Sequence, residues 1–182
     1  HQVRLAVRDV AAPDVQALVA AGAQAVPVAG AADGAEVIAL ALPFDAAADA
    51  LGRLGDLAGR VVVDCTNAVG PGLTLRYGGD SSGVEELAKR APGARMVKSF
   101  NQQGAEVLAA PRFDGVPAIN FVAGDDPEAR RVVAELGEDL GLSCLPTGPL
   151  ASARLLEAMT LVWIAASQPL GTRSFGLTLL RR

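Results

Sequence analysis

The fold class of this chain is decided by the stretch VVVDCTNAVG at residues 61–70. Three β-branched valines run into a polar turn, with Gly59 before the stretch and Pro71-Gly72 directly after it. A short valine-rich run bounded by glycine and proline is typical of a strand that is covered on both faces, as in parallel sheets. Open α/β sheets bind ligands at the carboxyl ends of their strands. The stretch therefore predicts a buried strand that presents Asn67 to a ligand.

The rest of the chain alternates between strand and helix patterns. Further strands are predicted at about residues 3–7, 25–28, 36–42, 95–100, 118–123 and 142–146. Helices are predicted at about residues 13–21, 45–54, 82–91 and 127–140, with a last, broadly apolar helix from Ser152 to near Pro169. Strands separated by helical patterns of about ten residues imply right-handed crossovers. We therefore expect an α/β fold with a doubly wound, mostly parallel sheet and a small carboxyl-terminal helical element.

Composition narrows the class of partner. The 182 residues are 51% hydrophobic, enough for one sizeable core, and the net charge of −4 lacks the basic footprint of a nucleic-acid binder. No apolar run approaches the roughly 18 to 20 residues that span a bilayer, and no secretion signal pattern opens the chain. We expect a cytoplasmic protein whose partner is a small molecule. Cys65 and Cys144 form no metal or redox motif and are expected in the core.

The histidine count narrows the chemistry. His1 is the single histidine, so a serine or cysteine nucleophile would have no internal imidazole as its base. Metal catalysis through several histidines is excluded by the same count. Hydride transfer between two bound cofactors needs little acid or base chemistry from side chains. The sequence thus favours an oxidoreductase and predicts neither a catalytic acid or base nor a metal ligand.

A family resemblance is carried by segments along the whole chain. In order they are ALALPF at 39–44, VDCTNA at 63–68, VKSFN at 97–101, FVAGDD at 121–126 and GPLASARLLE at 148–157. These segments resemble the NADPH-dependent oxidoreductases that reduce coenzyme F420, a deazaflavin. The same family includes the cytoplasmic reductase portion of membrane ferric reductases. The resemblance implies a Rossmann-type NADP-binding domain over residues 1–149, a helical element over residues 150–182, deazaflavin in the cleft between them, and a homodimer.

The resemblance also implies which residues bind the cofactors. Arg8 matches the arginine that binds the adenosine 2′-phosphate of NADP, and a guanidinium fork suits a phosphate. Asp9 directly follows it, which leaves NAD as an alternative to NADP. The ends of three strands are expected to line the nicotinamide side of the cleft. The residues at these ends are Pro43 and Phe44, Asn67 and Ala68, and Asn101 and Gln102.

The chain departs from the family pattern at its start. It opens where family members have their second strand, and no GxGxxG turn precedes residue 1. That turn holds the cofactor pyrophosphate on helix amides. The cluster Gly70-Pro71-Gly72 lacks a third glycine and a following helix pattern, so it is no replacement. We expect an incomplete nucleotide domain, truncated at the amino terminus, which leaves tight NADP binding open.

The sequence leaves other functions open. A related NADPH-dependent reductase could use a flavin or a ferric chelate as its acceptor, and a truncated domain could be non-catalytic and serve dimerisation. The direction of hydride transfer is open as well. Asn67 is as well suited to satisfying backbone groups in its turn as to binding a ligand. Asp64 is expected to cap neighbouring amides, and Asp125 and Asp126 to begin a helix rather than bind a metal.

Overall fold

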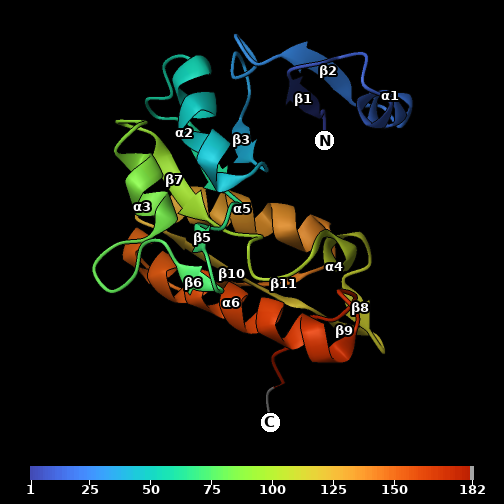
Figure 1. Cartoon of the computed structure of the whole chain (residues 1–182). Helices are drawn as coiled ribbons and strands as arrows, with labels where there is room; N and C mark the ends of the chain where they lie inside the picture. Colours follow the sequence, from blue (N-terminus) through green and yellow to red (C-terminus); the bar gives the residue numbers. More distant parts are fainter. Residues whose placement is uncertain (181–182) are drawn as a thin grey trace.

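The computed structural model describes residues 1–180. A five-stranded sheet holds most of the strands, and it lies at the centre of the molecule (Figure 1). The strand order is β11-β10-β7-β4-β3. The bounds are Val37–Leu40 for β3, Val61–Asp64 for β4, Arg95–Lys98 for β7, Ile119–Gly124 for β10 and Ser143–Pro146 for β11. β3, β4 and β7 run parallel, β10 is antiparallel to β7, and β11 is parallel to β10. The predicted α/β class and the mostly parallel sheet are confirmed.

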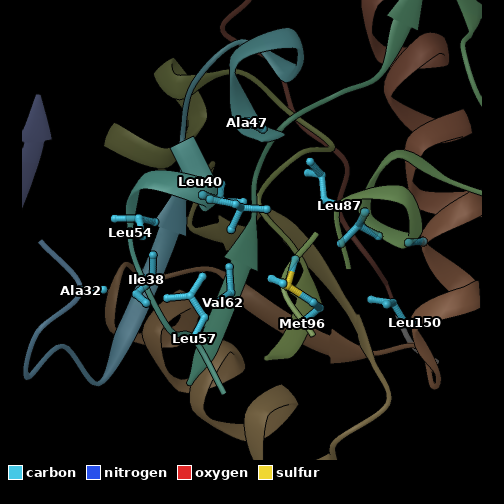
Figure 2. Close-up of a cluster of buried hydrophobic side chains, with 14 residues drawn as sticks. Ala32, Ile38, Leu40, Ala47, Leu54, Leu57, Val62, Leu87, Met96 and Leu150 are labelled. Atoms are coloured by element: carbon cyan, nitrogen blue, oxygen red, sulfur yellow. The ribbon is translucent and has the colours of Figure 1, made fainter. Parts of the chain in front are cut away.

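The valine-rich strand β4 is buried along its whole length, as its sequence predicted. Successive side chains of a strand point to opposite faces of the sheet. Val62 accordingly packs into one hydrophobic cluster, with Leu40, Leu87 and Met96 around it (Figure 2). Val61 and Val63 belong to a second cluster, together with valines of β7, β10 and helix α5. β4 therefore joins the two layers of the core.

Helices cover both faces of this sheet. Helices α2 (Phe44–Arg53) and α3 (Gly83–Ala88) contribute to the cluster around Val62, and α5 (Pro127–Asp139) packs on the other side. The predicted helix starts are confirmed. The Asp126 carboxylate accepts the Ala129 amide at 2.7 Å, and the Ser82 hydroxyl accepts the Glu85 amide at 3.4 Å. Such caps satisfy amides that have no partner within the helix.

The first thirty residues form a separate lobe (Figure 1). Strand β1 (Arg4–Val7), helix α1 (Pro13–Ala20) and strand β2 (Gln24–Pro27) build a two-stranded parallel sheet that does not join the central one. Within residues 1–31, all of which the structure describes, only Val15 is buried. The single doubly wound sheet of the sequence prediction is thus divided. β1 and β3 each keep one edge without a strand partner among residues 1–180.

The last helix follows β11 through a short 3-10 turn, η1 (Leu150–Ser152). Helix α6 spans Ala153–Leu170 and ends at Gly171, whose φ of 62° suits the left-handed residue that follows many helices. The predicted end near Pro169 is confirmed. Trp163 is buried, and its ring stacks on Phe175 of the carboxyl-terminal tail with centroids 5.1 Å apart. By length and composition alone, the 21 residues Leu150–Leu170 could cross a membrane, a stretch the sequence prediction overlooked.

Several short elements and two side chains differ from the predictions. The structure adds helix α4 (Ala105–Ala109) and two hairpins, β5 with β6 (Val69–Gly70, Thr74–Leu75) and β8 with β9 (Arg112–Phe113, Val116–Pro117). Leu18 and Leu140 belong to the apolar faces of the helices predicted at residues 13–21 and 127–140, but they are 52% and 50% exposed. No second layer covers α1 at Leu18 within the described chain, and Leu140 lies one residue beyond the end of α5.

Candidate functional site

Three strand ends converge at one edge of the central sheet. The register pairs Leu40 of β3 with Asp64 of β4, and Asp64 with Lys98 of β7, so the carboxyl ends of the three strands lie in line. The segments that follow are linked directly. The Asn67 amide group donates to the Asn101 backbone carbonyl at 3.1 Å, and the Asn101 amide group donates to Asn67 Oδ1 at 3.0 Å. The structure therefore brings two of the three predicted tips into contact.

The third tip, at Pro43 and Phe44, begins helix α2. Pro43 is exposed, and the half-buried Phe44 ring meets the edge of Tyr77 at a centroid distance of 5.9 Å. Arg76 lies over the same ring and forms an ion pair with Asp45, which lowers the pKa of the Asp45 carboxyl. A cavity of about 500 Å³ opens beside these side chains. Phe44 thus lines a cavity between α2 and the residues around Tyr77.

Asn101 and Gln102 are buried, and their side chains already have protein partners. The Asn101 amide group also donates to the Leu156 carbonyl and the Thr160 hydroxyl of α6, at 3.1 and 3.0 Å. The Gln102 side chain accepts the Phe121 amide at 3.0 Å and donates to Asn101 Oδ1 at 2.6 Å. These contacts fasten α6 and β10 to the end of β7. A cofactor-binding role for Asn101 and Gln102 stays a prediction.

The end of β4 carries a hydroxyl that has no hydrogen-bond partner within the described part of the chain. Thr66 is buried, its backbone amide donates to Asp64 at 2.9 Å, and its side-chain Oγ1 has no hydrogen-bond partner within residues 1–180. An unsatisfied buried polar group costs about 1–3 kcal/mol. Such a group beside the half-buried Asn67 fits a site that receives a polar ligand group. Ala68, by contrast, is 1% exposed and packs inside.

A buried cluster of charges lies beneath these strand ends. The Lys98 ammonium lies 2.7 Å from Asp64, 3.1 Å from Glu157 and 2.6 Å from the Thr66 carbonyl, and all three charged side chains are at most 1% exposed. Glu157 of α6 also accepts the Gly83 amide at the start of α3, at 3.0 Å. Asp64 caps the Thr66 amide as predicted. Sequence reasoning missed Glu157, although it is the single acidic residue of an apolar helix.

Arg8 lies outside the group of converging tips. It is exposed and follows the end of β1 in the separate lobe. Within residues 1–180 its guanidinium has no hydrogen bond or ion pair, which is the condition needed to receive a phosphate. The Asp9 carboxylate accepts a hydrogen bond from the Ala11 amide at 2.9 Å. Binding of a 2′-phosphate by Arg8 stays a prediction.

The two cysteines are free thiols with no nucleophilic character. Burial raises the pKa of Cys65 to about 12, the Asp64 carboxylate adds to the rise, and the Lys98 ammonium opposes it. Burial also raises the pKa of Cys144, against a hydrogen bond from Asn120. Both thiols are therefore neutral near pH 7. Within the described residues, no three histidine, cysteine or carboxylate side chains gather to hold a metal.

A second cavity lies at the opposite edge of the sheet. It measures about 520 Å³ and is lined by His1, by the amino ends of β3, β4 and β7, and by the last turns of α5. None of the predicted site residues lines it. Because open α/β sheets bind ligands at the carboxyl ends of their strands, we assign the candidate site to the edge of Thr66 and Asn67.

The chain is similar to several known proteins. The model of the family described as coenzyme F420-dependent NADP oxidoreductases matches residues 1–68. A crystal structure of a protein assigned as an F420-dependent NADP reductase, from Arthrobacter sp. FB24, is 28% identical with a TM-score of 0.89, covering 100% of this chain and 89% of that one. A hypothetical protein from Sinorhizobium meliloti is 33% identical with a TM-score of 0.70, covering 93% and 78%.

Another relative is a metalloreductase, a reductase named for a different electron acceptor. Metalloreductase STEAP3 from Rattus norvegicus is 37% identical over 105 residues, which are 58% of this chain. The chain spans about a fifth of the length of that relative, 21%. The fold and the comparisons together place the chain, with its Rossmann-like sheet, among relatives of NADP-dependent oxidoreductases. More narrowly, the chain belongs to the family of coenzyme F420-dependent NADP oxidoreductases.

Proposed function

We propose that this protein transfers a hydride between NADP(H) and the deazaflavin coenzyme F420. The observation that carries the proposal is the convergence of the β3, β4 and β7 ends beside α6, with a Thr66 hydroxyl among them that has no hydrogen-bond partner within residues 1–180. When both cofactors are bound, the reduced nicotinamide supplies two electrons and a proton as hydride, and solvent supplies the further proton that the deazaflavin takes up. The chain supplies binding, orientation and exclusion of water.

Specific side chains fit these tasks. Arg8 would bind the 2′-phosphate, since its guanidinium has no partner within residues 1–180. Thr66 and Asn67 would orient the nicotinamide end through hydroxyl and amide groups, and Pro43 with Phe44 would present an apolar wall there. The buried face of α6 shields the strand ends from water. The buried Lys98 cluster holds these pieces in place and needs no proton transfer of its own.

The pyrophosphate contact is not assigned to any of the described residues. A glycine-rich turn before a helix is the usual means of holding it, and the sequence contains no GxGxxG. In a doubly wound sheet, the strand that leads into this turn lies between the two strands that correspond to β1 and β3. Both have an open edge here.

The test follows the absorbance of oxidised deazaflavin during incubation with NADPH. We expect NADPH-dependent loss of that absorbance. Parallel reactions replace the deazaflavin with a flavin or with a ferric chelate. The metalloreductase relative favours the ferric acceptor as the second candidate. Turnover with one of those acceptors and none with the deazaflavin would reject the proposal in favour of a flavin or ferric reductase.

Replacing Arg8 tests the choice of nucleotide. We expect Arg8→Ala to raise the KM for NADPH by about 10- to 100-fold, the worth of charge-assisted bonds to a phosphate, and to leave the KM for NADH unchanged. Arg53→Ala is the matched control, because Arg53 is exposed on α2 and contacts only Asp49 at 3.9 Å among the described ion pairs. An equal rise for both nucleotides would show that Arg8 does not contact the 2′-phosphate.

A further inference from the structure

The cavity of about 500 Å³ beside Phe44 lies between helix α2, the end of helix α3 and the segment of Arg76 and Tyr77. The two helices are neighbours in the structure (Figure 1). Its apolar lining consists of Phe44, Tyr77, Ala48 and Leu87. Pockets that bind small molecules measure roughly 300 to 1,000 Å³ and combine apolar or aromatic walls with a few polar groups. The cavity is therefore large enough for a ring compound with a side chain.

This cavity adjoins the carboxyl end of β4. The Arg76 amide donates to the Ala68 carbonyl at 2.8 Å, and Arg76 Nε donates to the Val69 carbonyl at 3.2 Å. A Cβ atom at Gly83 would stand 2.8 Å from Phe44 Cε2 and 2.9 Å from the Ala68 Cβ, so these three residues meet at one point. Two walls of the cavity are thus fastened to the residue that ends the β4 tip. A molecule in the cavity would reach the strand ends that the proposed function assigns to the nicotinamide.

The charges around the cavity leave one guanidinium without a counterion. Three basic and two acidic side chains line it: Arg76, Lys89, Arg90, Asp45 and Glu86. Arg76 pairs with Asp45 at 3.0 Å, which lowers the pKa of that carboxyl. Lys89 pairs with Glu86 at 2.7 Å and lowers the pKa of that carboxyl as well. Arg90 is exposed, and within residues 1–180 its side chain forms no hydrogen bond or ion pair. The cavity therefore keeps one positive charge that no carboxylate neutralises.

The Arg90 guanidinium suits an anion on a bound molecule. A planar guanidinium with free N–H groups binds a phosphate or a carboxylate through paired, charge-assisted hydrogen bonds. A cationic group would meet repulsion there. The proposed function assigns the 2′-phosphate of NADP to Arg8, which lies in the separate lobe of β1 and β2. The anion that Arg90 would bind therefore belongs to the second cofactor, the electron acceptor.

We propose that Arg90 selects the electron acceptor by binding a phosphate or carboxylate on the side chain of that acceptor. The inference rests on the proposed function and adds the acceptor class, a ring compound with an anionic side chain. The ring would lie on the Phe44 side of the cavity, beside the strand ends, and the anion would lie at Arg90. Coenzyme F420 and flavin mononucleotide belong to this class, whereas riboflavin does not. Arg90 is a specificity-determining residue, because it binds a part of the acceptor that does not react.

Kinetics with two matched pairs of acceptors test this role. One pair is coenzyme F420 and the same deazaflavin without its phosphate- and carboxylate-bearing side chain, and the other is flavin mononucleotide and riboflavin. We expect Arg90→Ala to raise the KM for the anionic member of the pair that is reduced by about 10-fold. The kcat and the KM for the neutral member should not change, since a contact away from the reacting ring stabilises ground state and transition state alike. Arg90→Lys keeps the charge and should recover part of the loss.

Binding measured without NADPH separates this inference from the proposed function. Fluorescence titration of the four acceptors gives each dissociation constant whether or not hydride is transferred. Tighter binding of the anionic members that Arg90→Ala abolishes, without any turnover, would reject the proposed function and support the role of Arg90. A weakening for coenzyme F420 alone assigns the contact to a carboxylate, and a weakening for flavin mononucleotide as well assigns it to a phosphate.

Arg53→Ala is the matched control, because Arg53 is exposed on the same helix α2 and does not line the cavity. This variant should leave every KM and dissociation constant unchanged. Three results would overturn the inference: equal rises in KM for both members of a pair, no effect of Arg90→Ala on the anionic members, or no measurable binding of coenzyme F420 and flavin mononucleotide to the unmodified protein.

Discussion

At the scale of single residues, Lys98 shows how a polar side chain is accommodated at the centre of a sheet. Its ammonium is fully buried between Asp64 and Glu157, and a carbonyl oxygen gives it a third partner. A buried charge is tolerated when its hydrogen-bonding capacity is met in this way. The arrangement ties strand β4, strand β7 and helix α6 together. Neither of the two cavities described above is lined by these three side chains.

Removing the ammonium should destabilise the protein strongly. We expect Lys98→Met to lower the free energy of unfolding by about 3–5 kcal/mol, because two buried carboxylates lose their counterion. Urea denaturation followed by tryptophan fluorescence measures this loss. The double variant Lys98→Met with Glu157→Gln should recover part of it, since one of those charges is then gone. The exposed Lys89, paired with Glu86, gives the control Lys89→Met, which should barely move the midpoint.

At the scale of elements, the junction between α6 and β7 decides the shape of the site. The Thr160 hydroxyl donates to the Asn101 carbonyl at 2.9 Å, and the Asn101 amide group donates back to Thr160. Phe100, just before Asn101, has a φ of 59°, a left-handed conformation that costs a residue with a side chain about 1–2 kcal/mol. The strain is held by surrounding bonds, one of them from the Phe100 amide to Asn120 at 3.0 Å.

Thr160→Val should loosen this junction. The variant keeps the shape of the side chain and removes the hydroxyl, so buried groups of Asn101 lose a partner. We expect the free energy of unfolding to fall by about 1–3 kcal/mol, the cost of an unsatisfied buried group. Chemical denaturation measures this change in the free energy of unfolding. Ser167→Ala is the control, because the Ser167 hydroxyl donates to the Ile164 carbonyl within α6, and it should change the free energy of unfolding little. Equal losses for the two variants would show that the Thr160 hydroxyl does not stabilise the junction between α6 and β7.

At the scale of the whole molecule, the two sheets differ in how well they are covered. The central sheet lies between two hydrophobic layers, whereas residues 1–31 contain a single buried side chain, Val15. A two-stranded sheet with one weakly buried helix gains little from the hydrophobic effect. Local opening of the β1 to β2 lobe should therefore cost much less free energy than opening of the centre.

Hydrogen exchange measured by mass spectrometry checks this difference. Peptides covering Arg4–Pro27 should exchange orders of magnitude faster than peptides covering β4, β7 and β10. Saturating NADPH should slow exchange in the lobe more than in the centre, because Arg8 belongs to it. Equal protection of the lobe and the centre in the free protein would show that the lobe is held by contacts other than its own few buried side chains.

Much of the central fold could be predicted from local signals. The valine run of β4, the capping residues Ser82 and Asp126, and Gly171 at the end of α6 each act within a few residues, and each appears where the sequence indicated. The short elements α4, β5 and β8 were missed because two to five residues carry too little periodicity. Leu18 and Leu140 were misplaced because a helix pattern does not show which part of the helix meets a second layer.

The sequence by itself determined the α/β class, the order of the main elements, and the polar ends of β4 and β7, because strand and cap preferences are local properties of the chain. Only the tertiary structure decided that Lys98, Asp64 and Glu157 share one buried cluster. It also decided that the Asn101 and Gln102 side chains form hydrogen bonds with α6 and β10, and that the sheet of β1 and β2 is separate from the central sheet. These outcomes depend on contacts between residues far apart in the sequence, where burial and hydrogen-bond partners are set by packing.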